Sequence, residues 1–269
     1  MSIFVISDLH LSSFPGADKP MDVFGARWYD HPGRLERAWR ESITEDDTVL
    51  IPGDISWALK LEDARYDLDW VAALPGRKIL LKGNHDLWWT GITKLNKMYD
   101  NMTFLQNDHV FAEGCYICGS RGWLTPDSED FTEADEKIYR RELLRLESSL
   151  RSAAAAREAA GELAGSGADP GAGSSDPGEA DPGAGVAPPE TAADGEAPII
   201  GLLHYPPVSD ARRYSGFQQL FEDYGVKDVY YGHVHGEDGF RTRIQGELHG
   251  VRYHLVSLDY LDAQPLQIR

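Results

Sequence analysis

The sequence predicts an α/β protein in which two β-sheets stack as a sandwich flanked by helices. Short β-branched or apolar runs alternate with segments of helical periodicity, which is the pattern of βαβ units. The chain has 269 residues, of which 42% are hydrophobic, enough to bury the core of one large domain. It has two cysteines, too few for a disulfide framework. We therefore expect a single domain over residues 1–269.

The strands expected in the core are five short runs, each ended by a polar or glycine-containing cluster. Four or five apolar residues in a row are typical of strands that are buried on both faces. These runs cover residues 3–6, 48–51, 78–81, 199–203 and 228–231. Weaker strand patterns cover residues 103–106, 110–112, 116–118, 239–244 and 251–258.

Helices are expected where apolar residues recur at helical spacing, over residues 34–43 and 61–74. A further helix should begin after Thr132, whose hydroxyl can cap the first turn while Asp135 reaches back in a capping box. Its apolar positions continue to Leu146.

Residues 152–197 form a low-complexity segment of Ala, Gly, Pro, Ser, Asp and Glu without an aromatic residue. Such a composition buries too little apolar surface to offset the entropy of ordering, so we expect a disordered insertion within the domain. It is either a tolerated surface loop or a binding segment. Its nine acidic residues and one basic residue give it a net charge of −8, so the remainder carries −10 of the chain's −18.

The charge and the apolar pattern limit the classes of partner. An acidic protein repels nucleic acid and anionic lipid unless positive charge is concentrated locally or supplied by bound metal. No stretch approaches the roughly 20 apolar residues that span a bilayer, and Asp8 interrupts the first apolar run, unlike a signal peptide. With its two cysteines, the chain is expected to be cytoplasmic, without a nucleic-acid or membrane partner.

Candidate metal ligands follow the five expected core strands. In an open α/β sheet the carboxyl ends of parallel strands share one edge, where ligands bind. Five separate segments therefore point to one place. In chain order their residues are Asp8 and His10, Asp54, Asn84 with His85 and Asp86, His204, and finally His233 and His235.

These residue types suit two divalent cations. Carboxylate, amide oxygen and imidazole together favour Mn, Fe or Zn over calcium. A carboxylate can bridge two metals roughly 4 Å apart, the separation of two-metal hydrolysis, and we expect Asp54 to be that bridge. Two carboxylates against two divalent ions leave a local positive charge that attracts phosphate despite the acidic surface.

The motifs Asp-x-His, Gly-Asp, Gly-Asn-His-Asp, a single His and Gly-His-x-His occur in this order between residues 8 and 235. In this the chain resembles the calcineurin-like metallophosphoesterases. The residues around these motifs are similar to those of a bacterial subgroup of predicted phosphohydrolases. The resemblance implies the fold of that family. It places Asp8, His10, Asp54 and His235 on one metal, and Asp54, Asn84, His204 and His233 on the other.

The activity that the resemblance implies is hydrolysis of a phosphomonoester or phosphodiester by attack of a metal-bridging hydroxide. His85 would act as the general acid and Asp86 as the carboxylate that orients it. The expected partner is a small-molecule phosphoester, and no pattern indicates an oligomeric state. The alternatives are a non-catalytic scaffold of the same fold and a nuclease of the same superfamily. The scaffold is disfavoured because every ligand position is filled, and the nuclease because no basic stripe is present.

Other residues leave two interpretations open. Arg121 follows an expected strand and either anchors the substrate phosphate or forms an ordinary salt bridge. Trp57, Trp88, Trp89 and Trp123 lie near the motifs and either line a cleft or pack in the core. Residues 19–31 form a plain loop or close over the site. The remaining histidines, at positions 31, 109, 249 and 254, are expected to be structural or surface residues.

Overall fold

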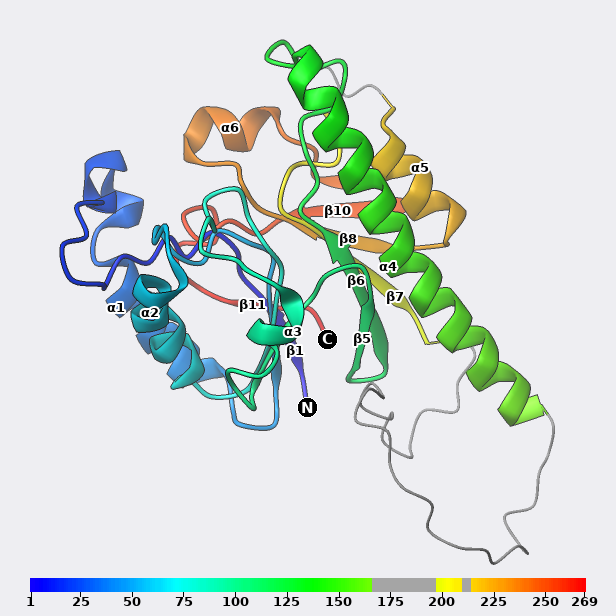
Figure 1. Cartoon of the computed structure of the whole chain (residues 1–269), viewed down its shortest axis with the longest axis horizontal. Helices are drawn as coiled ribbons and strands as arrows, with labels where there is room; N and C mark the ends of the chain where they lie inside the picture. The colour runs from blue at the N-terminus through cyan, green and yellow to red at the C-terminus, as the bar shows by residue number, and fades with distance from the viewer. Residues whose placement is uncertain (166–196, 210–213) are drawn as a thin grey trace, which may run out of the picture.

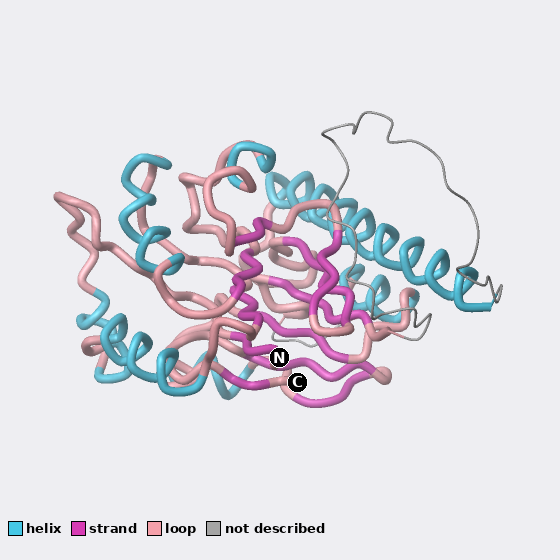
Figure 2. Tube along the Cα trace, turned by 90° about the horizontal axis from the view of Figure 1, so that it is seen from below, coloured by secondary structure: helices cyan, strands magenta, loops and turns pink. Residues whose placement is uncertain are grey.

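The computed structural model describes residues 1–165, 197–209 and 214–269. It consists of two mixed sheets flanked by helices (Figures 1 and 2), so the predicted fold class is confirmed. The strands are β1 Ile3–Val5, β2 Thr48–Ile51, β3 Arg77–Leu80, β4 Met102–Phe104, β5 His109–Ala112, β6 Cys115–Ser120, β7 Ile199–Leu203, β8 Asp228–Tyr231, β9 Gly246–Leu248, β10 Val251–Leu255 and β11 Leu266–Gln267. The helices are α1 His31–Ser42, α2 Leu61–Ala72, α3 Ile92–Leu95, α4 Glu133–Gly165, α5 Gly216–Asp223 and α6 Gly236–Thr242, with 3-10 turns η1 Met21–Phe24 and η2 Ala26–Trp28.

The first sheet has the order β11-β1-β2-β3-β4 and the second the order β5-β6-β7-β8-β10-β9. β1 to β4 pair in parallel, and so do β6, β7, β8 and β10. The antiparallel pairs involve β11, β5 and β9. Because the long parallel runs share one direction in each sheet, their carboxyl ends gather at one edge, where the expected ligands follow them.

Three apolar layers hold the sandwich together, and side-chain alternation along the strands assigns residues to them. Ile3 and Val5 of β1 lie in the layer between the two sheets, together with Ile200 and Leu202 of β7. Phe4 faces the other way, into the layer that α1 and α2 cover. The outer face of the second sheet packs against α4 and α5 (Figure 1). Both faces of each sheet are therefore covered, which explains why the core strands are continuously apolar.

The capping box expected at the start of α4 forms in part. The backbone N–H of Thr132 donates to Oδ2 of Asp135 at 2.9 Å, so Asp135 reaches back as expected. The Thr132 hydroxyl, however, also donates to this carboxylate, at 2.5 Å. Its hydrogen therefore goes to Asp135, and the carboxylate accepts both donors of the threonine.

Two expectations about elements need correction. Residues 152–165, expected to be disordered, continue α4 as helix, because Ala153 is fully buried against the second sheet and anchors that turn. The rest of the expected insertion, 166–196, lies outside the described residues. Residues 239–244, expected as a strand, belong largely to α6. Phe240 of this helix packs against the apolar layer on the outer face of the second sheet, and the chain is extended again at Arg243.

The described part of the chain contains no helix that is both long enough and apolar enough to cross a membrane.

Candidate metal centre

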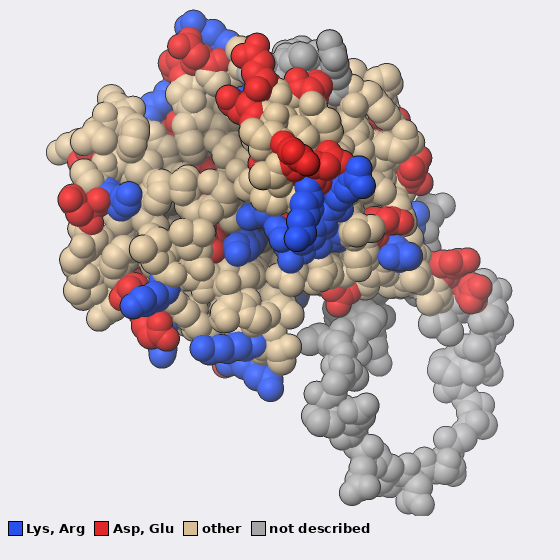
Figure 3. All heavy atoms as spheres, turned by 45° about the horizontal axis from the view of Figure 1, so that its top comes forward, with Lys and Arg blue, Asp and Glu red and all other residues tan. Residues whose placement is uncertain are grey.

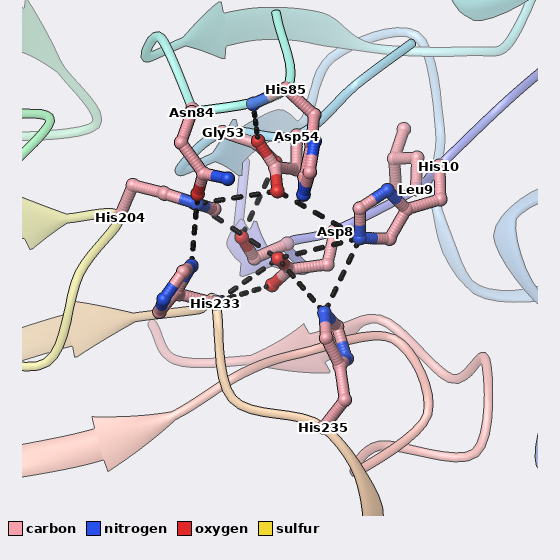
Figure 4. A network of polar contacts seen from close by, with 12 residues as sticks. Asp8, Leu9, His10, Gly53, Asp54, Asn84, His85, His204, His233 and His235 are labelled. Atoms are coloured by element: carbon pink, nitrogen blue, oxygen red, sulfur yellow. Dashed lines mark hydrogen bonds and ion pairs between the residues drawn. The ribbon is translucent and has the colours of Figure 1, made fainter. Parts of the chain in front are cut away.

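The seven predicted metal ligands lie together at the carboxyl edge of the two sheets (Figure 4). Asp8 and His10 follow β1, Asp54 follows β2, and Asn84 follows β3 in the first sheet. His204 follows β7, and His233 and His235 follow β8 in the second. The cluster is therefore assembled from both sheets.

A first group of ligand atoms comes from Asp8, His10 and His235, and these atoms lie within 4.8 Å of one another. The Nε2 atoms of the two histidines are 3.3 Å apart, and Nε2 of His235 is 3.5 Å from Oδ1 of Asp8. Two nitrogens bound at about 2.1 Å to one tetrahedral cation lie roughly 3.4 Å apart. The spacing of the two rings therefore suits coordination of a single ion.

A second group comes from Asp54, His204 and His233, again within 4.8 Å. The side-chain oxygen of Asn84 lies between the two imidazoles, 2.7 Å from Nε2 of His204 and 2.9 Å from Nδ1 of His233. Carboxylate, amide and imidazole donors thus converge here as well. This donor set is the one expected for a transition metal such as Mn, Fe or Zn.

Asp54 joins the two groups. Its Oδ2 is 3.3 Å from Nε2 of His204 in the second group and 3.8 Å from Nε2 of His10 in the first. Its other oxygen, Oδ1, accepts the backbone N–H of His85 at 2.8 Å. One carboxylate is therefore fixed by the Gly-Asn-His loop and faces histidines of both groups.

Tight backbone turns bring these side chains together. Asp8, His10, Asp54 and His233 all have positive φ, between 44° and 70°, a region that non-glycine residues rarely occupy. Such strain persists where the surroundings enforce it and is concentrated at functional sites. Four of the seven candidate ligands are held in this way.

The glycines of the motifs are required by contact distance. A Cβ atom added to Gly83 would lie 2.0 Å from Oδ1 of Asp54, and one added to Gly232 would lie 2.2 Å from Oδ2 of Asp8. Either distance is far inside van der Waals contact. These glycines therefore let the backbone approach the two carboxylates directly, which explains their place beside the ligand residues.

The orientation of His204 indicates that a cation belongs between the side chains. Its Nδ1 is 3.1 Å from the carbonyl oxygen of Pro52, which can only accept a hydrogen bond. With the proton on Nδ1, the lone pair of Nε2 faces oxygens of Asn84 and Asp54. Nε2 of His204 and the oxygens of Asn84 and Asp54 are then three electron-rich atoms that face one another. This arrangement is stable when a positive charge lies among them. Either a second proton or a metal ion can supply it.

The pKa shifts follow from burial and from this crowding. Burial opposes ionisation of Asp8, yet neighbouring His235 and His204 hold its pKa down at about 2. Burial lowers the pKa of His10 and of His233 to about 3. His235 shifts the other way, to a pKa of about 10, because Asp259 and Asp8 outweigh its burial. The ionised carboxylates and the neutral rings of His10 and His233 are in the protonation states that metal binding requires, whereas His235 would have to release a proton when it binds a metal ion.

His85, the predicted general acid, lies beside the ligand groups. Its ring centroid is 5.6 Å from that of His10 and 4.2 Å from the ring of Trp57. The ring is partly buried, and this burial lowers its pKa. Its role as general acid stays a prediction.

Asp86 does not hold His85 as the sequence suggested. Its carboxylate accepts backbone N–H groups of Gly83, Ile55 and Ser56 and the indole N–H of Trp88. Among the described residues, no hydrogen bond joins it to the His85 ring. The carboxylate is fully buried, and these hydrogen bonds link the loop after β2 to the loop after β3. Burial and the nearby Asp54 raise the pKa of Asp86 to about 7.

Arg121 forms the ion pair that the sequence left open. Its Nη2 is 3.3 Å from Oε1 of the buried Glu142, and its guanidinium lies 4.4 Å from the ring centre of Trp123. Contact with a substrate phosphate stays a prediction. Of the tryptophans, Trp88 and Trp89 are core residues.

Two aromatic residues line the first ligand group. Trp57 stacks on His10 with ring centroids 4.8 Å apart. Trp28, from the segment 19–31, lies edge-on to His235 at 5.3 Å. That segment therefore packs against the site, held in part by His31, whose Nε2 is 3.1 Å from the carbonyl oxygen of Leu9.

Sequence reasoning missed Asp259. Its Oδ1 is 2.8 Å from Nδ1 of His235, and its Oδ2 accepts the N–H of Gly236 at 3.1 Å. Carboxylates in this position fix the tautomer of a metal-binding histidine. The residue stands in the sequence Ser257-Leu-Asp-Tyr260, which carries no recognised motif. The one available signal was its position directly after an expected strand.

A comparison with family models agrees with the predicted family and fold. The family model described as calcineurin-like phosphoesterase matches residues 1–147. Among curated proteins, the Gene 66 protein of Mycobacterium phage L5 is 42% identical over 57 residues, which are 21% of this chain and 27% of the phage protein. The Gene 66 protein of Mycobacterium phage D29 is 33% identical over 107 residues, 38% of this chain and 50% of that protein. The chain thus spans half or less of these relatives.

Among solved structures, a phosphopantetheinyl hydrolase from Mycobacterium tuberculosis is similar with a TM-score of 0.47 and 17% identity, covering 99% of this chain and 95% of its own. A protein of unknown function from Aquifex aeolicus has a TM-score of 0.45 and 14% identity, with the same coverage. The family model covers more than half of the chain. The chain therefore belongs to the calcineurin-like phosphoesterase family.

Proposed function

We propose that this protein is a hydrolase that cleaves phosphomonoesters or phosphodiesters at the edge described above, with two divalent metal ions. The observation that carries the proposal is the position of Asp54 between two complete ligand groups. Asp8, His10, Asp54 and His235 would hold one ion, and Asp54, Asn84, His204 and His233 the other. When bound, such a pair supplies an activated water nucleophile and a Lewis acid for the phosphoryl oxygens.

The chain's own residues position these groups. Two buried carboxylates, Asp8 and Asp54, supply the negative charge that retains two cations. Asp259 fixes the ring of His235, and the carbonyl oxygen of Pro52 fixes that of His204. Trp57 and Trp28 cover one side of the ligand groups, which limits access of water from that side.

His85 is proposed to donate the proton to the leaving oxygen. Its ring stands beside both the ligand groups and Trp57, and is partly open to solvent. Although burial lowers the pKa of His85 in the free protein, a bound anionic phosphoester next to the ring favours the protonated form. Proton donation of this kind contributes about 10²- to 10⁴-fold to a rate.

The test combines metal analysis with hydrolysis of p-nitrophenyl phosphate and of bis(p-nitrophenyl) phosphate, with manganese as the first metal. Asp54→Asn should lose bound metal and nearly all activity. His85→Ala should keep its metal. Its kcat should fall by about 10²- to 10⁴-fold for an alkyl phosphate and by less for the nitrophenyl esters, whose leaving group needs little protonation.

His109→Asn is the matched control, because His109 lies outside the site and its Nδ1 contacts Ser152. This variant should retain full activity. A metal-loaded protein that hydrolyses no member of a broad phosphoester panel would refute the proposal and favour the scaffold alternative.

The proposed substrate is a small molecule rather than a long nucleic acid, since the formal charge of the chain is −18 and repels polyanions. A nuclease would instead bind a labelled duplex at low salt. A cytoplasmic location is also part of the proposal, supported by Cys115 and Cys118, which are both free and buried.

A further inference from the structure

A cluster of basic side chains lies beside the candidate metal centre and is not used by it. We call Lys82, Arg121, Arg141 and Arg145 the basic cluster. Three of its members contact one groove, which is also lined by Leu81, Leu105 and Gly119. Figure 3 shows Lys and Arg side chains gathered near the middle of one face of the molecule, with acidic side chains next to them.

The arginines of the cluster carry more positive charge than the carboxylate that they share among the described residues. Arg145, Arg121 and Arg141 approach the same oxygen, Oε1 of Glu142, at 3.0, 3.3 and 3.5 Å. Glu142 is fully buried. Three guanidinium groups therefore share one carboxylate.

A further observation shows that hydrogen bonding of the cluster is incomplete within the described residues. Nε of Arg121 is buried without a hydrogen-bond partner there, although guanidinium groups that lose water normally find acceptors. An anion with several oxygens would supply the missing acceptor.

The cluster is connected to the metal centre by short steps. Lys82 stands two residues before Asn84, and the carbonyl oxygen of Arg121 accepts the N–H of His204 at 3.1 Å. The guanidinium of Arg121 lies over Trp123 at 4.4 Å.

Contacts between aromatic rings continue from Trp123 to the metal centre. Trp123 lies 4.9 Å from Tyr205, and Tyr205 lies 4.0 Å from the ligand ring of His233, measured between ring centroids. These contacts make the basic cluster and the metal centre close neighbours in the structure.

We propose that the basic cluster binds a second phosphate of the substrate, so that the preferred substrates carry two phosphate groups, one hydrolysed and one held. Planar guanidinium groups match phosphate oxygens in geometry and charge. The assignment rests on the proposed hydrolase function. It adds the class of substrate, and explains how an acidic protein selects a polyanionic small molecule.

The first test compares hydrolysis of linear alkanediol bisphosphates of increasing length with that of the matched alkyl monophosphates. For a chain long enough to bridge both sites, KM for the bisphosphate should be lower by about tenfold, equivalent to one contact of about 1.4 kcal/mol. The double variant Arg141→Met/Arg145→Met should abolish this difference and leave turnover of the monophosphates unchanged. Arg121 remains to pair with Glu142 in this variant.

The matched control is Lys137→Met/Arg140→Met, which removes the same charge from the same helix. Both residues are exposed, and Arg140 pairs with Glu136 outside the cluster. The control should retain the preference for bisphosphates. Equal loss in both double variants would mean that net charge alone is responsible and would overturn the assignment.

A second measurement separates this inference from the proposed function. Binding of inorganic pyrophosphate to the metal-free protein, followed by calorimetry in the presence of a chelator, needs no catalysis. It should be detectable in the unaltered chain and in the control, and weaker by about tenfold or more in the cluster variant. If no phosphoester is hydrolysed but this pattern holds, the hydrolase proposal fails and the anion site stands. Absent or unaltered pyrophosphate binding overturns the site.

Discussion

At the scale of single residues, the glycines of the site act through what they lack. Gly83 has an ordinary φ, yet its missing side chain leaves room for Asp54, whose backbone nitrogen lies 2.2 Å from the position of a Cβ atom. Oδ1 and the backbone nitrogen of Asp54 are the nearest atoms that a Cβ atom on Gly83 would meet. One is a fixed ligand atom and the other belongs to the backbone, so neither can move aside. The sequence pattern Gly-Asn-His predicted the site, but the steric reason for the glycine needed the fold.

Replacing Gly83 by alanine should therefore test the steric effect alone, because the φ of Gly83 is one that alanine also adopts. Gly83→Ala should lower the free energy of unfolding by about 1–3 kcal/mol through overpacking, and should weaken metal binding because Asp54 moves. Chemical denaturation and metal titration measure the two effects. Gly91→Ala, where no atom lies within 4 Å, should change neither, and an equally harmful Gly91→Ala would contradict this explanation.

Asp259 acts through His235. Its second oxygen also accepts the N–H of Gly236, and its backbone carbonyl accepts from Arg27, so the carboxylate is well fixed. It escaped sequence reasoning because it contributes no ligand atom of its own and follows no motif.

Asp259→Asn should weaken metal binding by about 10- to 100-fold while the protein remains folded. Competition with a metal-sensitive dye measures this without reference to activity. Asp262→Asn is the control, since Asp262 is exposed and pairs with Arg34. Unchanged affinity in Asp259→Asn would show that the contact has no positioning role.

At the scale of elements, strand pairs are stabilised by residues that the motifs do not include. In the pairing of β8 with β10, Asp228 lies opposite Arg252. The carboxylate accepts hydrogen bonds from Nε and Nη2 of the arginine at 2.8 and 2.6 Å. Nε2 of His254 is a further 3.0 Å from Oδ1, which agrees with the structural role expected for this histidine.

This ion pair should make stability depend on pH in the acid range. Although burial opposes it, the contacts with Arg252 and His254 lower the pKa of Asp228 from its ordinary value of 3.8. The stabilisation is thus present above that value and is lost as the pH falls through the lower pKa of the folded state. Asp228→Asn should cost about 1 kcal/mol at neutral pH, since the pair is partly exposed, and nothing once the carboxylate is protonated. Unfolding followed at several pH values tests this, with the fully exposed Asp238→Asn as control.

The elements themselves were predictable to different degrees. β2, β7 and β8 have the expected limits, because an apolar run bounded by a ligand motif specifies both ends of a buried strand. α6 was mistaken for a strand, since Phe240 is its one large apolar residue and shows no periodicity that could distinguish a short helix from an extended segment. The continuation of α4 through Ala153 was hidden because the composition there is that of a disordered segment, and only the packing partner reveals its burial.

At the scale of the whole molecule, each ligand group takes residues from both sheets. Asp8 and His10 come from the first sheet and His235 from the second, while Asp54 comes from the first and His204 from the second. The order of the motifs predicted that these residues meet at one place, but the sheet from which each comes and the distances between them depend on how the sandwich closes. An ion bound by either group links the two sheets.

Metal binding should consequently stabilise the whole fold. A cation at about 100 times its dissociation constant adds about 2.7 kcal/mol to the free energy of unfolding, or roughly 5–10 °C in Tm for a domain of this size. Thermal unfolding with manganese and with a chelator measures the shift. Asp54→Asn should reduce it strongly. An identical Tm with and without metal would mean that the ligand groups bind no ion in the folded state.

The two ends of the connection between α4 and β7 lie away from the sheet edge that carries the candidate metal ligands. The chain leaves α4 at Gly165 and enters β7 at Ile199, at the amino end of the strand, whereas the ligands follow the carboxyl ends (Figure 1). A fluorescent domain or an affinity tag placed between these two points would be attached away from the candidate metal centre. The fold thus offers an internal labelling position for following the protein in living cells.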